Sequence, residues 1–329
     1  MSSTSSVESS TSSNRLLTVL GPTATGKTAL ACEVAYRLDG EIISADSRQV
    51  FRGMDIGTGK DLGDYDIHGS HIPYHIIDIH DPGYEYNVYQ FQNDFLAAYA
   101  GITERGRLPI MCGGTGMYLE SVLRGYRLPN APVDERYRQS LEPCSDASLI
   151  ERLAGYIKLH NHTDTETRDR LVRALEIQEF GEQNPDDYVH MPPMRHLVVG
   201  IALPREVVVG RIERRLRQRL DEGMIDEVSN LLEQGVPAER LLRYGLEYRH
   251  VTRYLKGECT YDELFTNLFT DIRRFSKRQM TWFRRMERNG VKIVWIDGQK
   301  NVESMADEVV ELAKQTILSD PDAKNVASI

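Results

Sequence analysis

The sequence predicts an α/β protein with a P-loop NTPase-like parallel sheet, helices on both faces of that sheet and a helical insertion domain. Short apolar runs alternate with helical patterns from residue 16 to residue 124, as is typical of parallel sheets. A glycine-rich turn follows the first apolar run, and a series of helical patterns without an intervening strand follows residue 124. These features indicate a phosphate-binding core interrupted by inserted helices.

The first half of the chain contains the strands and helices of the expected sheet. Each expected strand is a short apolar run, and each expected helix repeats apolar residues at three- and four-residue spacing. The strands are Leu16–Leu20, Glu41–Ala45, His75–Ile79 and Leu108–Cys112, and the helices are Thr28–Leu38 and Val88–Glu104.

The second half of the chain starts with the insertion and then returns to the sheet. The inserted helices are Asp134–Leu141, Ser145–Leu159 and Thr165–Phe180, and the later elements are a strand over His196–Ala202, helices over Arg205–Gln234 and Tyr261–Arg288, and a strand over Lys292–Ile296. Gly235 is placed to end the helix before it. We therefore expect a disordered tail over 1–14, a core over 15–125 and 195–318, an insertion domain over 126–194 and a loose tail over 319–329.

Charge is distributed unevenly in this chain of 329 residues, whose formal net charge is −9. Arg205–Arg219 contains six Arg and two Glu, and Arg273–Arg288 contains seven basic residues and one Glu. Local positive surpluses on an acidic protein suit a polyanion that binds at one site.

Composition also argues against several classes of protein. No apolar run approaches the roughly 20 residues that span a bilayer, so no membrane association is expected. The Ser-rich N-terminus lacks a secretory signal, and a transit peptide is a less favoured alternative because the segment has no amphipathic pattern. Cys32, Cys112, Cys144 and Cys259 are isolated, which argues against disulfides and a Cys-based zinc site and favours a cytoplasmic protein.

The turn after the first strand has the spacing of a phosphate-binding loop. It matches G-x-x-x-x-G-K-[ST] and lies between an expected strand and an expected helix. The candidate ligands are Gly21, Pro22, Thr23, Ala24, Thr25, Gly26, Lys27 and Thr28. In such loops backbone N–H groups surround a phosphate chain, the lysine contacts the terminal phosphates and the Thr hydroxyl binds Mg²⁺. We expect Lys27 and Thr28 to have these roles.

The loop predicts a polyphosphate ligand without specifying a nucleotide. A kinase would need an acidic residue at the end of a second strand to hold Mg²⁺, and Asp46 and Asp78 are both candidates. Spacing alone therefore leaves a kinase open.

Several motifs together resemble the tRNA dimethylallyltransferase (isopentenyltransferase) family. In addition to the loop Gly21–Thr28 they are Ile43-Ser-Ala-Asp-Ser-Arg-Gln-Val-Phe51, Gly53-Met-Asp-Ile-Gly-Thr-Gly-Lys60, Gly113-Gly-Thr-Gly-Met-Tyr118, Arg170-Leu-Val-Arg-Ala-Leu-Glu176, Arg211-Ile-Glu-Arg-Arg-Leu, Gly223-Met-Ile-Asp-Glu-Val228 and Lys277-Arg-Gln-Met-Thr-Trp-Phe283. Their order and spacing fit from Leu16 to Arg285.

The resemblance implies a prenyl transfer to tRNA. The loop would hold the pyrophosphate of dimethylallyl diphosphate, and Asp46 would receive the N6 proton of the adenosine just 3′ of the anticodon. Lys27, Thr28, Mg²⁺, Thr115 and Arg215 would stabilise the leaving pyrophosphate. From the residues alone, Arg215 also fits a solvated helix face, and Thr115 also fits a tight turn between a strand and a helix.

A basic stripe on the last long helix suggests an RNA-binding surface. Arg274, Lys277, Arg278, Thr281, Arg284 and Arg285 recur at three- and four-residue spacing, with aromatic residues between them. An amphipathic helix with a charged outer face is the alternative, and we favour it for Phe275 and Phe283. The expected tRNA contacts are Asp46, Ser47, Arg48, Gln49, Arg170, Arg173, Tyr248, Arg249, Lys277, Arg278, Gln279 and Trp282.

One motif departs from the pattern of the family. Glu247 stands where a Gly usually precedes the Tyr-Arg pair, which puts the roles of Tyr248 and Arg249 in doubt. The resemblance also implies that the insertion embraces the tRNA anticodon stem-loop.

Three other functions remain as alternatives. They are prenylation of free AMP or ADP, an ATP-dependent kinase, and RNA binding without catalysis. The inserted helices and the basic helix argue against the first, because a mononucleotide has no stem-loop to embrace. A kinase would leave Gly113-Gly-Thr115 and the basic stripe unexplained. The intact Lys27, Thr28, Asp46, Thr115 and Arg215 argue against the third. We expect a monomer, because one chain supplies both the pyrophosphate site and the RNA-binding residues.

Overall fold

The computed structural model describes residues 14–156 and 165–319. Contacts between residues divide the chain into two compact units, one formed by Met1–Arg124 with Pro192–Ile329 and the other by Gly125–Met191. The insertion domain was expected to span 126–194. The two expected tails fall outside the described residues, except for Asn14 and Ser319.

The first unit is built on a six-stranded sheet with the order β5-β2-β6-β1-β7-β8. Every pair of neighbouring strands is parallel. The strands are β1 (Arg15–Leu20), β2 (Gly40–Ala45), β5 (Tyr74–His75), β6 (Leu108–Gly113), β7 (Arg195–Ala202) and β8 (Ile293–Asp297). A separate antiparallel pair is formed by β3 (Asp66–Ile67) and β4 (Ser70–His71).

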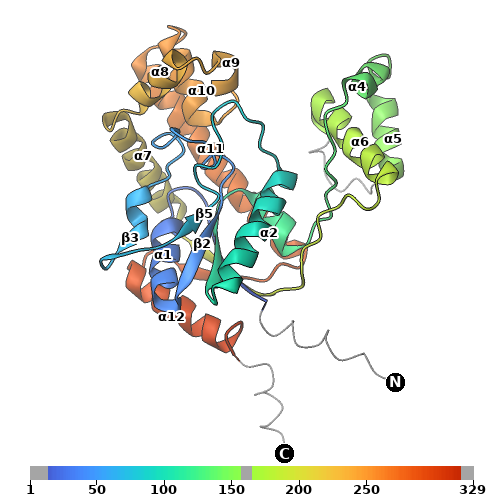
Figure 1. The fold of residues 1–329 in the computed structure, drawn as a ribbon. Helices are drawn as coiled ribbons and strands as arrows, with labels where there is room; N and C mark the ends of the chain where they lie inside the picture. The colour runs from blue at the N-terminus through green and yellow to red at the C-terminus, as the bar shows by residue number, and fades with distance from the viewer. Residues whose placement is uncertain (1–13, 157–164, 320–329) are drawn as a thin grey trace, which may run out of the picture. The chain divides into compact units, whose positions relative to one another are not determined.

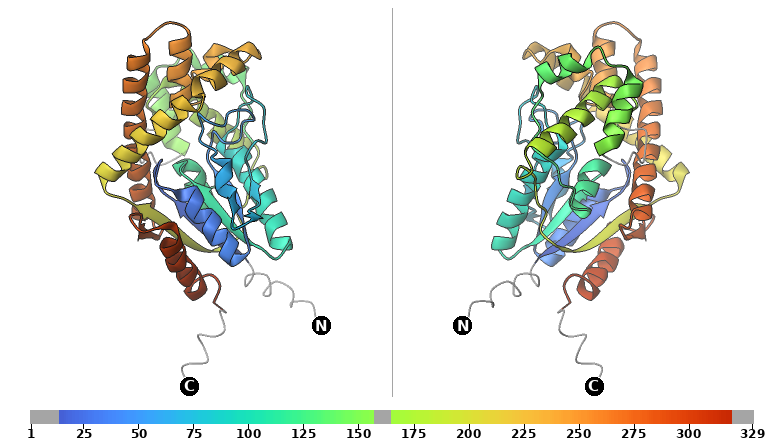
Figure 2. Two further views of the ribbon diagram at one scale, coloured as in Figure 1. Left: turned by 90° about the vertical axis from the view of Figure 1, so that its left-hand side faces the viewer. Right: turned by 90° about the vertical axis from the view of Figure 1, so that its right-hand side faces the viewer.

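Helices cover both faces of this sheet (Figures 1 and 2). On one face α1 (Lys27–Leu38) and α12 (Val302–Gln315) pack against each other and against the strands. On the other face lie α2 (Val88–Glu104) and α3 (Gly116–Leu123). The predicted arrangement of helices on both faces of a parallel sheet is confirmed.

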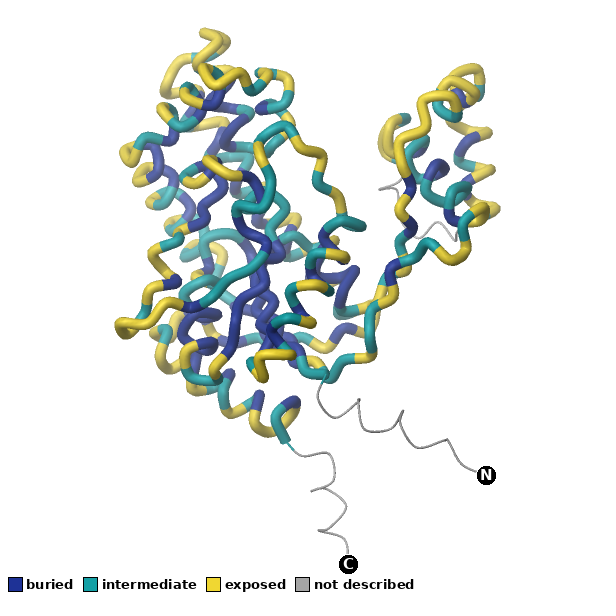
Figure 3. Tube along the Cα trace, viewed as in Figure 1, coloured by how far each residue is buried: buried dark blue, intermediate teal, exposed yellow. Residues whose placement is uncertain are grey.

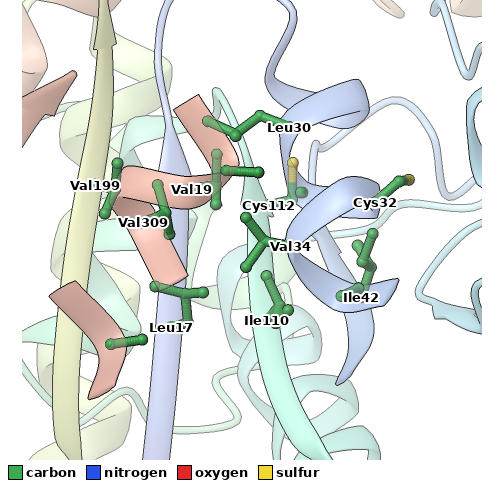
Figure 4. Packing of buried hydrophobic residues seen from close by; sticks show 14 of the residues in the cluster. Leu17, Val19, Leu30, Cys32, Val34, Ile42, Ile110, Cys112, Val199 and Val309 are labelled. Atoms are coloured by element: carbon green, nitrogen blue, oxygen red, sulfur yellow. The ribbon is translucent and has the colours of Figure 1, made fainter. Parts of the chain in front are cut away.

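The core beneath α1 and α12 is made of aliphatic side chains. Leu17 and Val19 of β1 meet Leu30 and Val34 of α1 and Val309 of α12, and all five are fully buried (Figure 4). The central strands are buried on both faces, so their sequences are nearly continuous apolar runs (Figure 3).

The C-terminal helices lie in the same unit. They are α7 (Arg205–Asp221), α8 (Met224–Glu233), α9 (Ala238–Leu241), α10 (Leu246–Leu255) and α11 (Tyr261–Arg288). The single helix expected over Arg205–Gln234 is broken at Gly223, whose φ of 99° lies in the left-handed region. α11 has the predicted bounds because Thr260 and Glu263 form a capping box at its start.

The strand expected over His75–Ile79 is only partly present. Residues Tyr74–His75 pair with β2, but Ile76 and Asp78 have φ values of 63° and 56°, which end the extended conformation. The helices α3, α9, α10 and α12 were not predicted. No described helix is long and apolar enough to cross a membrane.

The second unit contains α4 (Glu135–Leu141), α5 (Asp146–Tyr156) and α6 (Arg168–Gln183). The end of the helix expected over Ser145–Leu159 lies outside the described residues. Leucines form its small core, namely Leu141, Leu149, Leu153, Leu171 and Leu175. Arg168 donates hydrogen bonds to the backbone carbonyl groups of Leu141, Glu142 and Cys144, which ties the start of α6 to the end of α4.

Candidate active site

Three connections leave the carboxyl edge of the sheet side by side. The loop Gly21–Thr28 follows β1, Asp46 follows β2 and Gly114 follows β6. In the sheet register Gly113 of β6 lies opposite both Leu20 and Ala45, so these connections begin at the same level. Ligands of open α/β sheets bind at this edge.

The loop after β1 is shaped to receive an anion. Ala24 and Gly26 have left-handed backbone conformations, with φ values of 64° and 89°. Helix α1 begins at Lys27, and no side chain caps its N-terminus. Its first N–H groups and its dipole therefore offer a site for phosphate.

Lys27 lies in an unfavourable electrostatic setting without an anion. Its Nζ donates to the carbonyl oxygen of Pro22 at 2.8 Å. Burial is the main cause that lowers the pKa of Lys27 to about 8. The positive charge of Arg215 acts in the same direction, and Asp46 opposes it. A bound pyrophosphate would reverse this effect by favouring the charged lysine.

Two cavities meet at Lys27, Thr28 and Arg215. The first, of about 60 Å³, is also lined by Asp46 and Gln279 and will be called the donor cavity. The second, of about 250 Å³, adds Asp61, Asp64 and Arg211. Burial raises the pKa of Cys112, which lines the donor cavity, to about 12, so this thiol stays protonated.

Asp46 lies beside Arg48, whose positive charge is offset by an ion pair with Glu247. Its Oδ1 accepts a hydrogen bond from the backbone N–H of Arg48 at 2.9 Å. The guanidinium group of Arg48 donates to Glu247 at 2.8 Å, and Glu247 is only 6% exposed. The Glu that departs from the family pattern thus provides the main ion pair of Arg48.

Thr115 and Gln49 connect these loops to one another. The Thr115 hydroxyl accepts a hydrogen bond from the backbone N–H of Ser47 at 3.1 Å. The Gln49 amide donates to the carbonyl oxygen of Gly59, and its oxygen accepts from Ser44. Thr115 therefore lies directly beside the Asp46 segment.

Gln279 belongs to the interior of the site. It is buried on α11, where its oxygen accepts from Thr23 N–H at 2.8 Å and its amide donates to the Gly114 carbonyl oxygen at 2.9 Å. It therefore fixes the loop after β1 to the loop after β6. This position is a correction to its expected contact with tRNA, because both ends of its amide are used within the protein.

Tyr248 also differs from the expectation of a tRNA contact. Its side chain is fully buried against Gly57, where a Cβ would lie 2.7 Å from the ring. Its hydroxyl donates to Glu227 at 2.6 Å. Tyr248 is thus a packing residue, while its neighbour Arg249 donates to the carbonyl oxygen of Leu242 and stays partly exposed.

The motif Gly53–Lys60 is held by a carboxylate that sequence reasoning missed. Glu227 accepts hydrogen bonds from the N–H groups of Asp55, Ile56 and Gly57 at 2.7–3.0 Å. The only signal in the sequence is that Glu227 lies in one of the motifs of the resemblance.

Lys60 holds Asp78, the second acidic residue that was a candidate Mg²⁺ ligand in the sequence. Its Nζ is buried and bonds to the carbonyl oxygen of Phe51 and to the carboxylates of Asp55 and Asp78. Because Asp78 is engaged by this lysine, Asp46 is the acidic residue that remains at the donor cavity.

The basic residues of α11 take several positions. Lys277 and Arg278 are exposed and have no ion pair among the described residues. Arg285 instead pairs with the buried Glu120 at 2.6 Å and lies over the Trp282 ring. Only part of the predicted stripe is therefore available to a ligand.

The two expected RNA contacts of the second unit also differ from each other. Arg173 donates to the carbonyl oxygens of Ala131 and Pro132 and pairs with Glu176, which gives it a structural role in its own unit. Arg170 is exposed and pairs with Glu166.

Comparison with known proteins identifies the family of this chain. Residues 49–286 match the family described as IPP transferase. The chain is 51% identical over 297 residues to tRNA dimethylallyltransferase 2 of Phocaeicola vulgatus, covering 90% of this chain and 97% of that protein. It is 52% identical over 298 residues to tRNA dimethylallyltransferase 1 of Geotalea uraniireducens, covering 90% and 97%.

Solved structures show the same likeness. The tRNA isopentenylpyrophosphate transferase of Bacillus halodurans has a TM-score of 0.69 and 32% identity, with 95% of this chain and 99% of that chain covered. A eukaryotic dimethylallyltransferase acting on tRNA has a TM-score of 0.71 at 20% identity, with 92% and 79% covered, a likeness of fold. The fold together with these relatives defines a transferase. The chain belongs to the tRNA dimethylallyltransferase family, also called the IPP transferase family.

Proposed function

We propose that this protein transfers a dimethylallyl group from dimethylallyl diphosphate to N6 of the adenosine 3′ of the anticodon in tRNA. The observation that carries the proposal is the donor cavity, where Asp46 lies with Lys27, Thr28 and Arg215 at the carboxyl edge of the sheet. A carboxylate beside a cationic phosphate-binding site suits a reaction in which the acceptor amine gives up a proton and the prenyl donor releases pyrophosphate.

The chemistry follows from the positions of these residues. The N6 lone pair attacks the first carbon of the prenyl group, the bond from that carbon to the pyrophosphate oxygen breaks, and the N6 proton passes to Asp46. An amine whose lone pair is delocalised gains typically 10²–10⁴-fold from such a base. Lys27, Arg215 and the N–H groups at the start of α1 stabilise the negative charge on the leaving pyrophosphate. Thr115 positions the segment that carries Asp46.

A Mg²⁺ ion fits the same region. Thr28 and Asp64 line one cavity and supply oxygen ligands of the kind that Mg²⁺ prefers, whereas Asp61 in the same cavity is paired with Arg215. No group of three or more His, Cys, Asp or Glu among the described residues would hold a metal by itself, so phosphate oxygens and water would complete the coordination. When bound, the ion would offset charge on the pyrophosphate.

The acceptor base has an adjacent cavity. A cavity of about 490 Å³ is lined by Ser47, Arg48, Phe51, Tyr84 and Tyr244, among others, and shares Arg48 with the donor cavity. Aromatic rings and guanidinium groups are the surfaces on which unstacked bases bind. A flipped adenosine in this cavity would contact Ser47 and Arg48, which directly follow Asp46 in the chain.

The wider RNA surface is also part of the proposal. The exposed Lys277 and Arg278 on α11 would contact phosphates of the anticodon stem-loop, as would Arg170 of the second unit. We propose that the enzyme works as a cytoplasmic monomer, because one chain carries both a complete set of pyrophosphate-binding groups and the exposed cations of α11.

The test is a transfer assay with defined acceptors. Purified protein with Mg²⁺ and radiolabelled dimethylallyl diphosphate is given unmodified tRNA, AMP or ADP in parallel. We expect label in tRNA alone, and we expect Asp46→Asn to lose most of it. Asp39→Asn is the matched control, because Asp39 lies exposed at the opposite end of β2.

Each alternative function predicts another result. Label on AMP or ADP alone would assign the protein to mononucleotide prenylation. Turnover of ATP without any label transfer would indicate a kinase, and binding of tRNA without either reaction would indicate an RNA-binding protein.

A further inference from the structure

Arg219 is a buried cation of the donor cavity that the proposed reaction does not use. It lies one helical turn after Arg215 on α7 and lines the donor cavity with Lys27 and Asp46. Arg219 is only 9% exposed, and its Nη2 has no hydrogen-bond partner among the described residues. A buried charged donor without an acceptor costs free energy, so a ligand atom is expected to satisfy it.

The neighbouring groups do not neutralise this cation. Asp61 lies 3.5 Å from Nη2 of Arg219, but its carboxylate is in direct contact with Arg215 and is 42% exposed. One partly solvated carboxylate therefore faces two guanidinium groups. Burial, with the charge of Arg215, lowers the pKa of Arg219 to about 10, and the group remains charged at neutral pH.

The two arginines approach the same surface. A Cβ added to Gly59 would lie 1.7 Å from Nη2 of Arg219 and 2.7 Å from Nη2 of Arg215. Gly59 has a φ of 65° and no side chain, which lets both guanidinium groups converge there. Two adjacent cations beside Lys27 match a ligand with two linked phosphates better than a single phosphate.

We propose that Arg219 is a further pyrophosphate-binding residue, which donates from Nη2 to the diphosphate of the prenyl donor beside Arg215. This inference rests on the proposed function, since it assigns a role within the same donor cavity. It concerns binding of the diphosphate and not the transfer of the proton.

The test is the affinity for inorganic pyrophosphate with Mg²⁺, measured by calorimetry on the full chain. Arg219→Met removes the charge at similar size, and we expect the Kd to rise about 10- to 100-fold. Arg219→Lys keeps a charge but cannot place a donor at Nη2, so an intermediate loss is expected. The control is Arg217→Met on the same helix, where Arg217 pairs with Glu213 and lies over Phe265.

Kinetics separate this role from a structural one. In the transfer assay Arg219→Met should raise the KM for dimethylallyl diphosphate and leave the KM for tRNA unchanged. If Arg219→Met folds poorly, Arg219→Met with Asp61→Asn removes both charges of the pair and is compared with Asp61→Asn alone.

Several outcomes would overturn the inference. A Kd of Arg219→Met within about twofold of wild type would do so, with or without a fall in Tm, and so would an equal loss in Arg217→Met. Failure of the wild-type chain to bind pyrophosphate would overturn the donor site of the proposed function as well. Wild-type binding with an unchanged Arg219→Met would overturn the role of Arg219 alone.

Discussion

Burial of Lys27 changes its pKa, and the charge of Lys27 is what a bound pyrophosphate would meet. A lysine amine usually titrates near pH 10.5, but burial in the donor cavity lowers the pKa of Lys27 to about 8. The titratable groups that act on this pKa besides burial are Cys112, Arg215, Asp46 and Arg48. The free protein therefore loses this positive charge as the pH rises through 8, and a pyrophosphate dianion or trianion would restore it.

We therefore predict that pyrophosphate binding takes up a proton at alkaline pH. At pH 7 Lys27 is mostly charged and contributes only about a tenth of a proton, whereas at pH 9 most of it is neutral and uptake should approach one proton per site. Calorimetry in buffers of different ionisation enthalpy measures this quantity. Lys27→Arg supplies the baseline, because its guanidinium group stays charged and pyrophosphate itself also exchanges protons.

Equal proton uptake by Lys27→Arg and wild type at pH 9 would contradict this prediction. It would mean that the proton is taken up by the ligand or by another group, and that Lys27 is charged in the free protein.

The sequence predicts the identity of these residues better than their contacts. The loop spacing places Lys27 and Thr28 because a strand, a loop and a helix form locally. The partners of Arg48 and Gln279 are 199 and 256 residues away along the chain, at Glu247 and Thr23. Such pairings depend on tertiary packing, which is why the contacts that Gln279 makes within the protein were not predicted and Arg219 was not singled out.

At the level of elements, the loop Gly53–Lys60 is ordered by α8 and α10. Glu227 of α8 accepts three backbone N–H groups of the loop, and Tyr248 of α10 packs on Gly57 and bonds to the same carboxylate. The loop in turn carries Gly59, on which the guanidinium groups of Arg215 and Arg219 lie. Helices remote from the sheet therefore shape one wall of the donor cavity.

We predict that Glu227→Gln destabilises the protein by about 1–3 kcal/mol. A carboxamide has one acceptor oxygen, so it cannot accept from all three N–H groups and from Tyr248. Urea unfolding followed by circular dichroism measures the change. Asp226→Asn is the control, because Asp226 is the exposed neighbour on the same helix and should change the free energy of unfolding by less than about 0.5 kcal/mol.

Equal unfolding free energies for wild type and Glu227→Gln would show that water or another group satisfies the loop N–H groups. The loop would then be held mainly by the contact between Tyr248 and Gly57.

Elements with strong local signals were predicted well, and those without were not. The bounds of α2 and α11 are those expected, since a capping box starts each helix. The break at Gly223 was missed because an apolar pattern continues on both sides of it. The strand expected over His75–Ile79 ends at His75, because Ile76 is buried in a left-handed conformation. An apolar run in the sequence does not reveal such a backbone conformation.

The whole protein has a net charge of −9, so only a small part of its surface can attract tRNA, which is a polyanion. Much of its arginine is paired internally, as with Arg285 and Glu120 or Arg173 and Glu176. Lys277 and Arg278 on α11 are exposed and form no ion pair with any residue that the structure describes, so they matter more for RNA binding than the total charge suggests.

We predict that tRNA affinity depends steeply on salt and that Lys277 and Arg278 account for part of this dependence. Each phosphate contact in a single-stranded region contributes about 0.7 to the slope of log K against log salt, so Lys277→Gln with Arg278→Gln should reduce the slope by about 1.4. Fluorescence anisotropy with labelled tRNA at several salt concentrations measures it. Lys292→Gln with Lys314→Gln is the control, because it removes the same charge from exposed positions outside α11 and should leave the slope nearly unchanged. An equal decrease in both double variants would show that tRNA responds to net charge, and the RNA surface would then have to be sought away from α11.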